Sequence, residues 1–214
     1  MRITNFSLKL AGGIAAVLSF GLQAHATGVD EGETLDVDVA IVFAIDYSSS
    51  IDPDTADLQR NGHVAALTSP EFLDAISSNH RGCIGATYFE WSSPSQTRIV
   101  LPWTKICGPE DARAAAGVIS RKGDTGYVRR GRGGTSISTA IDIAGLLLEQ
   151  FPGTAERKVI DISGNGENNE GLPVHVSRRK AIEKGYTINA IAVPNDKEAP
   201  PPGFSWPPIF RTTS

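Results

Sequence analysis

Residues 37–50 read VDVAIVFAIDYSSS and decide the fold class. The first nine residues form a nearly continuous apolar, β-branched run, which is typical of a strand covered on both faces within a parallel sheet. The run ends in an acidic, hydroxyl-rich loop. Asp52 and Pro53 then supply an N-cap residue and a proline for the first turn of a helix. We therefore expect a buried strand, a polar loop at its carboxyl end, and a helix.

The rest of the chain alternates strand and helix patterns. Further strands are predicted over 83–91, 97–103, 158–163 and 186–193, the first two joined by a turn to form a hairpin. Helices are predicted over 58–76 (one long helix, or two separated at Ser69-Pro70), 111–120, 135–151 and 174–184. This order predicts a doubly wound α/β fold with a mainly parallel sheet and one antiparallel edge hairpin.

The N-terminal segment has the pattern of a secretory signal peptide. Arg2 and Lys9 flank the start of an apolar run over 10–22, which is shorter than the roughly 20 residues of a membrane span. The sequence Ala-His-Ala at 24–26 then places small residues at the two positions that signal peptidase reads. We expect a signal peptide over 1–26, a leader over 27–36, the folded domain over 37–193 and a proline-rich irregular tail over 194–214. The mature protein would be periplasmic or secreted, with no membrane span.

The charge of the chain argues against one class of partner. Removing residues 1–26 takes away two of the 20 basic residues and none of the 24 acidic ones, which leaves a net charge of about −6. An acidic chain does not attract phosphate backbones or anionic membranes. We therefore expect no nucleic-acid partner.

The two cysteines fit the predicted hairpin. If it folds about a centre near residue 95, facing residues have numbers that sum to about 190, as Cys83 and Cys107 do. Because an exported protein can form disulfides, we expect a Cys83–Cys107 bridge, although a slip of one residue would point the thiols to opposite faces. The same hairpin would bring Trp91 and Trp103 near each other, as a core or cross-strand pair.

Asp46, Ser48 and Ser50 form an Asp-x-Ser-x-Ser loop at the carboxyl end of the first predicted strand. A carboxylate and two hydroxyls on alternate residues of a tight loop can converge on one point, and hard divalent cations prefer such oxygen ligands. Open α/β sheets bind ligands at this end of their strands. The sequence therefore predicts a divalent-cation site.

Three loops of the chain resemble those of the von Willebrand factor A domain. They are Asp-x-Ser-x-Ser after the first strand, Gly-Gly-Thr at 133–135 before a helix, and Ser-Gly-Asn-Gly at 163–166 after a later strand. In that fold the three loops form a metal-ion-dependent adhesion site (MIDAS). The stretches 90–92, 100–104, 132–135 and 161–164 are most similar to an exported bacterial branch known only as a domain of unknown function (DUF1194-like). The resemblance spans about residues 36–195.

The resemblance implies a role for each site residue. Asp46, Ser48, Ser50 and Thr135 would hold Mg²⁺ (or Mn²⁺ or Ca²⁺), and Asn165 stands where the family usually has aspartate. Losing one of two carboxylates should weaken cation binding, or leave a site that fills only when a ligand supplies its own carboxylate. The family fold also adds a strand and a helix after 186–193, which are missing here. Either the tail replaces them, or one sheet edge is exposed.

Three functions are considered. The first is a non-enzymatic binding module, in which the cation receives an acidic side chain from a protein partner. The second is a metal-free scaffold on which the metal site is retired. The third, a metal-assisted hydrolase, needs a general base, and Glu167 and Asp161 are the nearby acids. Asp161 lies inside a predicted strand and is expected to be structural.

The histidines give no sign of a metal site. Their positions lack metal-ligand spacing, and they are expected to be surface or helix-face residues: His63, His80 and His175.

Overall fold

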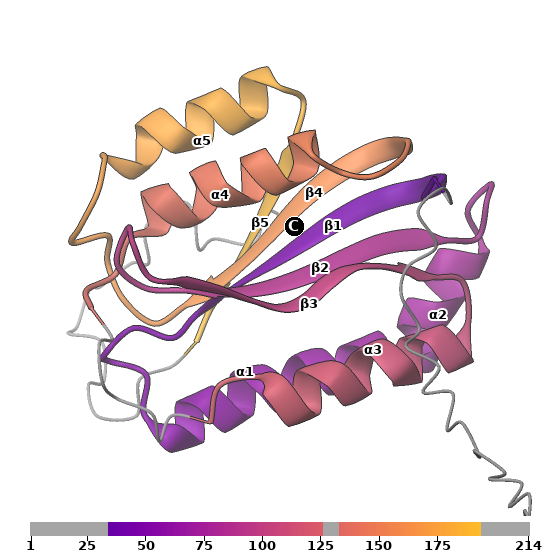
Figure 1. The fold of residues 1–214 in the computed structure, drawn as a ribbon, viewed down its shortest axis with the longest axis horizontal. Coiled ribbons are helices and arrows are strands. Elements are labelled where there is room, and N and C mark those ends of the chain that lie inside the picture. The colour runs from indigo at the N-terminus through magenta and orange to yellow at the C-terminus, as the bar shows by residue number, and fades with distance from the viewer. Residues whose placement is uncertain (1–33, 126–132, 194–214) are drawn as a thin grey trace, which may run out of the picture. The chain divides into compact units, whose positions relative to one another are not determined.

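A computed structural model describes residues 34–125 and 133–193 of the chain. The predicted signal peptide and most of the leader (1–33), the loop 126–132 and the tail 194–214 lie outside the described residues. Helices cover both faces of a single sheet (Figure 1). The strands are β1 (Val37–Asp46), β2 (Ile84–Trp91), β3 (Thr97–Ile106), β4 (Ala155–Gly164) and β5 (Thr187–Ala192). The helices are α1 (Pro53–Leu67), α2 (Pro70–Ser77), α3 (Pro109–Lys122), α4 (Ile137–Glu149) and α5 (Val174–Glu183).

The sheet has the order β3-β2-β1-β4-β5, with β1 at its centre. β1 runs parallel to β2 and to β4, β4 runs parallel to β5, and only β2 and β3 are antiparallel. This confirms the mainly parallel sheet with one antiparallel edge hairpin. The chain builds the sheet outward from β1 first on one side and then on the other. The topological switch point, where such folds bind ligands, is therefore the carboxyl end of β1, at Asp46.

Capping residues separate the first two helices. Asp52 accepts a hydrogen bond from the Thr55 N–H (2.9 Å) and begins α1. Ser69 accepts one from the Phe72 N–H (3.2 Å) and begins α2, with Pro70 in the first helical position. The chain therefore forms two helices in this region, which decides between the two alternatives left by the sequence.

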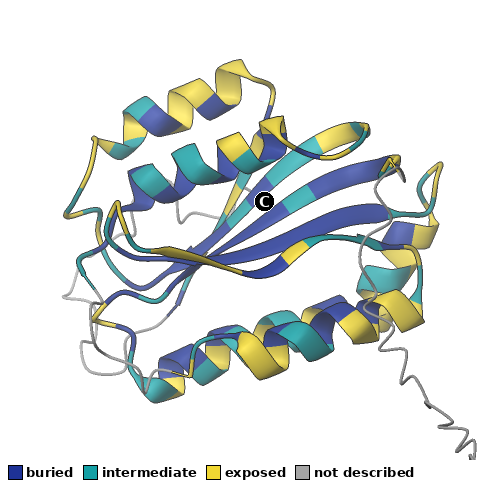
Figure 2. Ribbon diagram, in the orientation of Figure 1, coloured by how far each residue is buried: buried dark blue, intermediate teal, exposed yellow. Residues whose placement is uncertain are grey.

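The two faces of the sheet carry separate cores, and the helices turn their buried sides toward it (Figure 2). α4 and α5 cover one face, and α1, α2 and α3 cover the other. The first core includes Phe89, Trp91, Ile141, Leu148 and Ile160. The second includes Phe43, Tyr88, Leu101, Ile106 and Ile119. Because β1 contributes to both cores, it needs apolar residues on both faces, as its sequence has.

The hairpin follows the predicted register at its open end only. Ile84 faces Ile106, next to the Cys83–Cys107 disulfide, whose Cα atoms lie 4.2 Å apart, so the predicted bridge is confirmed. Two register shifts between residues 86 and 89 move the pairing toward the turn, where Trp91 faces Thr97. Trp103 instead packs edge-to-face on Phe151, with ring centroids 4.7 Å apart. Of the two alternatives left by the sequence, the two tryptophans therefore do not form a cross-strand pair, and both contribute to the same core.

β5 is the last strand of the described sheet and pairs only with β4 within that part of the chain. Its residues alternate between exposed and half-buried, and the Ile191 side chain is 47% exposed. The residues that would follow it, 194–214, lie outside the described part. This strand forms one wall of the groove described below.

Candidate metal centre

Three loops meet at the carboxyl ends of β1 and β4. Asp46 is the last residue of β1, and Asn165 directly follows β4. Because the two strands are parallel neighbours, with Ile45 paired to Ser163, their loops leave the sheet side by side. The segment before α4 joins them, since the Gly133 carbonyl accepts a hydrogen bond from the N–H of Ser49 (3.2 Å). The structure thus brings together all five residues selected from the sequence: Asp46, Ser48, Ser50, Thr135 and Asn165.

A directed chain of side-chain hydrogen bonds links the three loops. The Thr135 hydroxyl donates to Ser48 Oγ (3.3 Å), and the Ser50 hydroxyl donates to Asn165 Oδ1 (2.8 Å). The Ser48 and Ser50 oxygens are 3.1 Å apart. Because the proton of Ser50 is used on Asn165, Ser48 is the donor between them. Each serine oxygen therefore donates one bond and accepts one, which leaves a further lone pair on each.

The carboxylate of Asp46 is buried, with 1% of the residue exposed, and is fixed from two sides. Its Oδ1 accepts from the Ser48 N–H (2.8 Å) and its Oδ2 from the Asn165 N–H (3.4 Å). A Cβ at Gly164 would lie 3.1 Å from Oδ2, so glycine lets the end of β4 approach this carboxylate closely. The loop backbone therefore holds the acid at the meeting point of the three loops.

The assembled donors suit a hard divalent cation. They are one carboxylate, three hydroxyls and one amide carbonyl, all oxygen ligands of the kind that Mg²⁺, Mn²⁺ and Ca²⁺ accept. Four of the five residues are at most 7% exposed, whereas Ser50 is exposed, so the cluster faces solvent at Ser50. The only charge within this donor set is that of Asp46. The residues present fit a cation, and cation binding itself stays a prediction.

Gln59 supports the site and was not predicted from the sequence. This residue of α1 is 5% exposed. Its amide nitrogen donates to the carbonyl oxygen of Asp46 (3.0 Å), and its amide oxygen accepts from the Ser163 hydroxyl (2.7 Å). Gln59 thus joins α1 to the ends of both β1 and β4. A single polar residue on a helix gives no sequence signal for such a bridge.

The third loop also positions the second. The Asn169 side chain accepts from the Thr135 N–H (2.7 Å), and the Asn169 N–H donates to the Thr135 carbonyl (2.9 Å). The Asn168 side chain accepts from the Ser138 N–H (3.0 Å) in the first turn of α4. Ser136 is the N-cap residue of α4, but its hydroxyl donates to Thr139 (2.8 Å), so the side-chain acceptor for the first turn is Asn168.

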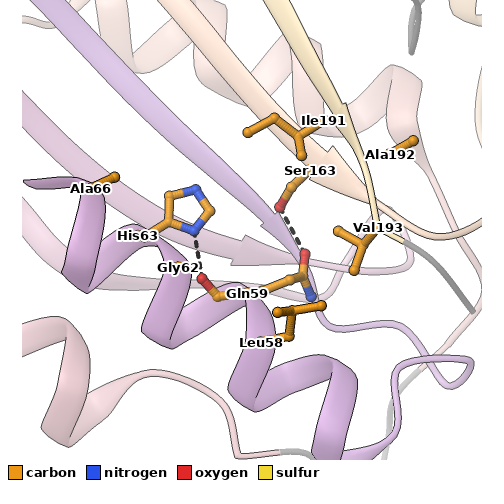
Figure 3. Close-up of a pocket in the computed structure, with 9 residues that line it drawn as sticks. All are labelled: Leu58, Gln59, Gly62, His63, Ala66, Ser163, Ile191, Ala192 and Val193. Carbon is orange, nitrogen blue, oxygen red and sulfur yellow. Dashed lines mark hydrogen bonds between the residues drawn. The ribbon is translucent and has the colours of Figure 1, made fainter.

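A mostly apolar groove of about 310 Å³ lies between α1 and β5, directly beside Gln59 (Figure 3). Its lining residues are Leu58, Gln59, Gly62, His63, Ala66, Ser163, Ile191, Ala192 and Val193. Since Gln59 and Ser163 belong both to this lining and to the bridge beneath Asp46, the groove borders the metal centre.

His63 and Asp161 are half-buried on the α1 side of the sheet and interact electrostatically. The Nδ1 of His63 is 2.7 Å from the Gln59 carbonyl, and its ring contacts Phe43 and Tyr88 edge-on. Burial lowers the pKa of His63 and raises the pKa of Asp161, and each charge opposes the shift of the other. Asp161 interacts with His63 and with the Asn189 side chain.

Comparison with known proteins assigns the family. A model of the family described as "Protein of unknown function (DUF1194)" matches residues 36–205. The chain belongs to this family. No curated protein matches this DUF1194 chain.

Solved structures show that the DUF1194 chain has a von Willebrand factor A-like fold. One is proximal thread matrix protein 1 of the mussel byssus, solved with a zinc-occupied MIDAS motif (20% identity, 75% of this chain and 39% of that chain, TM-score 0.55). A second is the pilus adhesin SpaC of Lactobacillus rhamnosus GG (14% identity, 75% and 25%, TM-score 0.53). A third is a von Willebrand factor type A protein of Catenulispora acidiphila (17% identity, 72% and 33%, TM-score 0.50).

The DUF1194 chain spans about two fifths or less of the length of these solved proteins. The similarity to these structures confirms the von Willebrand factor A-like fold that the three loops predicted. The sheet order confirms the doubly wound architecture. Within residues 34–125 and 133–193, the helices are too short or too polar to cross a membrane.

Proposed function

We propose that this DUF1194 chain is an exported binding module that engages a partner protein through a divalent cation. The ligands would be Asp46, Ser48, Ser50, Thr135 and Asn165. The convergence of three distant loops into one chain of hydrogen-bonded oxygen donors carries the proposal. The fold supports it, because a mussel byssus matrix protein of similar fold carries a zinc-occupied MIDAS motif and a pilus adhesin shares the fold.

Each residue has a distinct task in this proposal. Asp46 supplies the charge, held in place by the N–H groups of Ser48 and Asn165. Ser48, Ser50 and Thr135 supply hydroxyl oxygens, and Asn165 supplies a neutral carbonyl oxygen. When bound, Mg²⁺ or Mn²⁺ would offer an open coordination position to a carboxylate of the partner.

The charge of the donor set favours an acidic partner group. One carboxylate and one divalent cation leave the loaded site with a net positive charge, because Asn165 is neutral. A partner carboxylate would neutralise that charge in a mostly buried setting, whereas a neutral amide would not. Asn165 therefore favours a site that binds its cation weakly alone and more tightly with an acidic ligand.

The cation is tested with two neighbouring serines. Ser50→Ala removes one donor from an exposed position, and Ser49→Ala makes the same change one residue earlier, where only the backbone contacts the second loop. Calorimetric titration of Mg²⁺ and Mn²⁺ should give saturable binding to the unchanged protein and to Ser49→Ala, and binding at least about tenfold weaker to Ser50→Ala. Equal binding by both variants would contradict the assignment.

The partner is tested with a random-peptide display selection in Mg²⁺ and elution with EDTA. Peptides rich in Asp or Glu should be enriched, and their amide counterparts should not bind. Binding that survives EDTA would instead favour the metal-free scaffold, which needs no cation. Export is tested separately by the mass of the secreted chain, which should begin at residue 27.

The hydrolase alternative has less support. Asp161, one of the two acids considered as general bases, lies within β4 beside His63 and Asn189. Glu167, the other, is exposed. A hydrolase screen with common ester and phosphoester substrates should show no Mg²⁺-dependent turnover, and turnover that is lost in Ser50→Ala would revive this alternative.

A further inference from the structure

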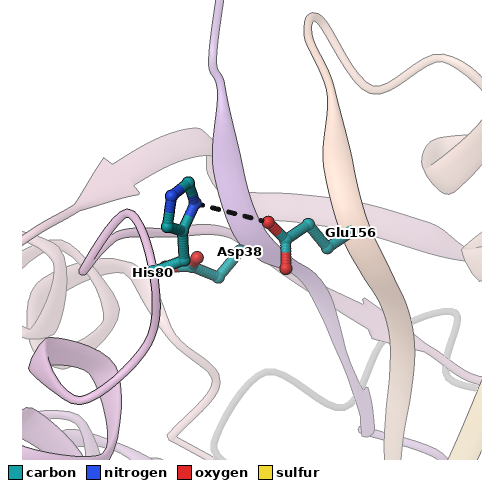
Figure 4. Close-up of side chains that lie close together, drawn as sticks. All are labelled: Asp38, His80 and Glu156. Atoms are coloured by element: carbon teal, nitrogen blue, oxygen red, sulfur yellow. Dashed lines mark ion pairs between the residues drawn. The ribbon is translucent and has the colours of Figure 1, made fainter.

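Three potential metal ligands meet at the opposite end of the sheet from Asp46. Asp38 lies near the start of β1, Glu156 near the start of β4, and His80 in the connection between α2 and β2 (Figure 4). One ligand atom from each side chain lies within 4.8 Å of the other two. Eight residues of extended strand separate Asp38 from Asp46, which places the two clusters about 26 Å apart.

We propose that Asp38, His80 and Glu156 form a second metal site, one that binds a borderline cation of the Zn²⁺ class. His80 Nδ1 lies 3.7 Å from Glu156 Oε1. Two ligands that are each about 2.1 Å from a tetrahedral zinc ion lie about 3.4 Å apart, so this pair needs little adjustment. The His80 and Glu156 side chains are 81% and 55% exposed, so they are free to close the remaining distance to Asp38.

Asp38 is the fixed ligand of the three. It is 2% exposed, and its carboxylate accepts hydrogen bonds from the backbone N–H groups of Arg81 (2.8 Å) and Cys83 (3.1 Å) and also interacts with that of Gly82. The two oxygens of a carboxylate have four lone-pair positions, so three N–H groups still leave one position for a metal. The bonds from Arg81 and Cys83 also hold the chain that follows His80 against the start of β1.

Two further contacts anchor the connection between α2 and β2 that carries His80. The side chain of Arg157, the neighbour of Glu156, donates to Asn79, the neighbour of His80, at 3.3 Å. The disulfide from Cys83 ties the end of the connection to the residue that follows β3. Because the backbone of all three ligands is anchored before a metal arrives, binding has to order only two exposed side chains.

The ligand types distinguish this cluster from the one at Asp46. Imidazole nitrogen is a ligand for zinc and neighbouring transition metals, whereas Mg²⁺ and Ca²⁺ prefer oxygen alone. One imidazole and two carboxylates give three protein ligands and leave a fourth position for water, as in open zinc sites. This proposal does not depend on the cation at Asp46, because the two clusters share no residue.

The test compares three variants of the full, untagged chain in millimolar Mg²⁺, so that the oxygen-only loop does not compete for zinc. His80→Ala and Glu156→Gln change the two exposed ligands, and His175→Ala removes an exposed histidine of α5 as the matched control. Asp38 is left unchanged because its carboxylate holds the backbone N–H groups of the connection that follows His80. Zinc affinity is measured by competition with a chromogenic chelator.

We expect one Zn²⁺ per chain in the unchanged protein and in His175→Ala. The His80→Ala variant should lose that zinc, and Glu156→Gln should bind it at least about tenfold more weakly. Zinc should also shift the imidazole NMR signals of His80 and leave those of His63 in place. Zinc affinity equal to that of the unchanged protein in His80→Ala, or the absence of saturable binding in the unchanged protein, would overturn the proposal.

Discussion

Replacing Asn165 with aspartate restores the second carboxylate that this family of sites usually carries. Asn165 is 7% exposed, and its backbone N–H lies 3.4 Å from the Oδ2 of Asp46. The new carboxylate would therefore add a negative charge next to an existing one in a mostly buried position. We expect Asn165→Asp to make the protein less stable without a cation and more stable with one.

The size of both effects follows from the spacing of the charges. Two carboxylates about 5 Å apart, with an effective dielectric constant of about 20, repel each other by about 3 kcal/mol. Partial protonation relieves some of this, so we expect a loss of about 1–2 kcal/mol in EDTA, or about 2–8 °C in Tm. A bound divalent cation removes the repulsion between the two carboxylates. If this adds about 1.4–3 kcal/mol to the binding free energy, Asn165→Asp binds the cation about ten- to hundredfold more tightly.

The assay is thermal unfolding of Asn165→Asp in EDTA and across a Mg²⁺ titration, with Asn169→Asp as the control. Asn169 is in the same loop and exposed, and an aspartate there would keep the acceptor for the Thr135 N–H. The Tm curves of Asn165→Asp and the unchanged protein should cross as Mg²⁺ rises, whereas those of Asn169→Asp should not. If Asn165→Asp were as stable as the unchanged protein in EDTA and responded no more strongly to Mg²⁺, the charge argument would be wrong.

Three further predictions concern the fold. Burial raises the pKa of Asp161, so this acid stabilises the native state only when it is protonated, and that stabilisation is lost as pH rises through its pKa. The Asp161→Asn variant should therefore have a higher Tm than the unchanged protein at pH 7 but not at pH 3. Equal Tm shifts at the two pH values would contradict this. Replacing Cys83 and Cys107 with serine removes a cross-link between residues 24 positions apart. The free energy of unfolding, measured in urea, should fall by about 3 kcal/mol, and a loss under about 1 kcal/mol would contradict a stabilising role of the disulfide. Arg98→Met leaves the buried Glu90 carboxylate without its ion-pair partner and should lower the free energy of unfolding by about 2–3 kcal/mol. Adding Glu90→Gln should restore part of that free energy, and no recovery would show that the lost ion pair is not the cause.

The order of strands and helices was predictable because local signals mark each element. The apolar run of β1, the N-cap and proline before α1, and the Ser69-Pro70 interruption each act over a few residues. The Cys83–Cys107 bridge was also predictable, since only the open end of the hairpin had to be in register. The two register shifts near residue 87 were not predicted, although Pro102 lies in β3 at this irregularity and proline within a sheet is typical of edge strands and bulges.

The convergence of the candidate ligands was predictable from the sequence, but the residues that support them were not. Asp46 and Asn165 follow strands that the sequence identifies, and parallel neighbours bring their ends together. Gln59 gives no such signal, because a polar residue on a helix face is usually solvated and only the packing of α1 turns it inward. The same applies to His80, whose proximity to Asp38 and Glu156 depends on three separate parts of the chain.

The long sequence separation of the site residues has a consequence for folding kinetics. The hydrogen bonds that join the five candidate ligands across different loops link residues 87 to 119 positions apart, and those between the first and third loops lie at the ends of the paired strands β1 and β4. Contacts of such high order are expected to form late, after the main folding barrier. A cation at Asp46 would then leave the refolding rate unchanged and slow unfolding. The bound metal would therefore increase the kinetic stability of the native domain.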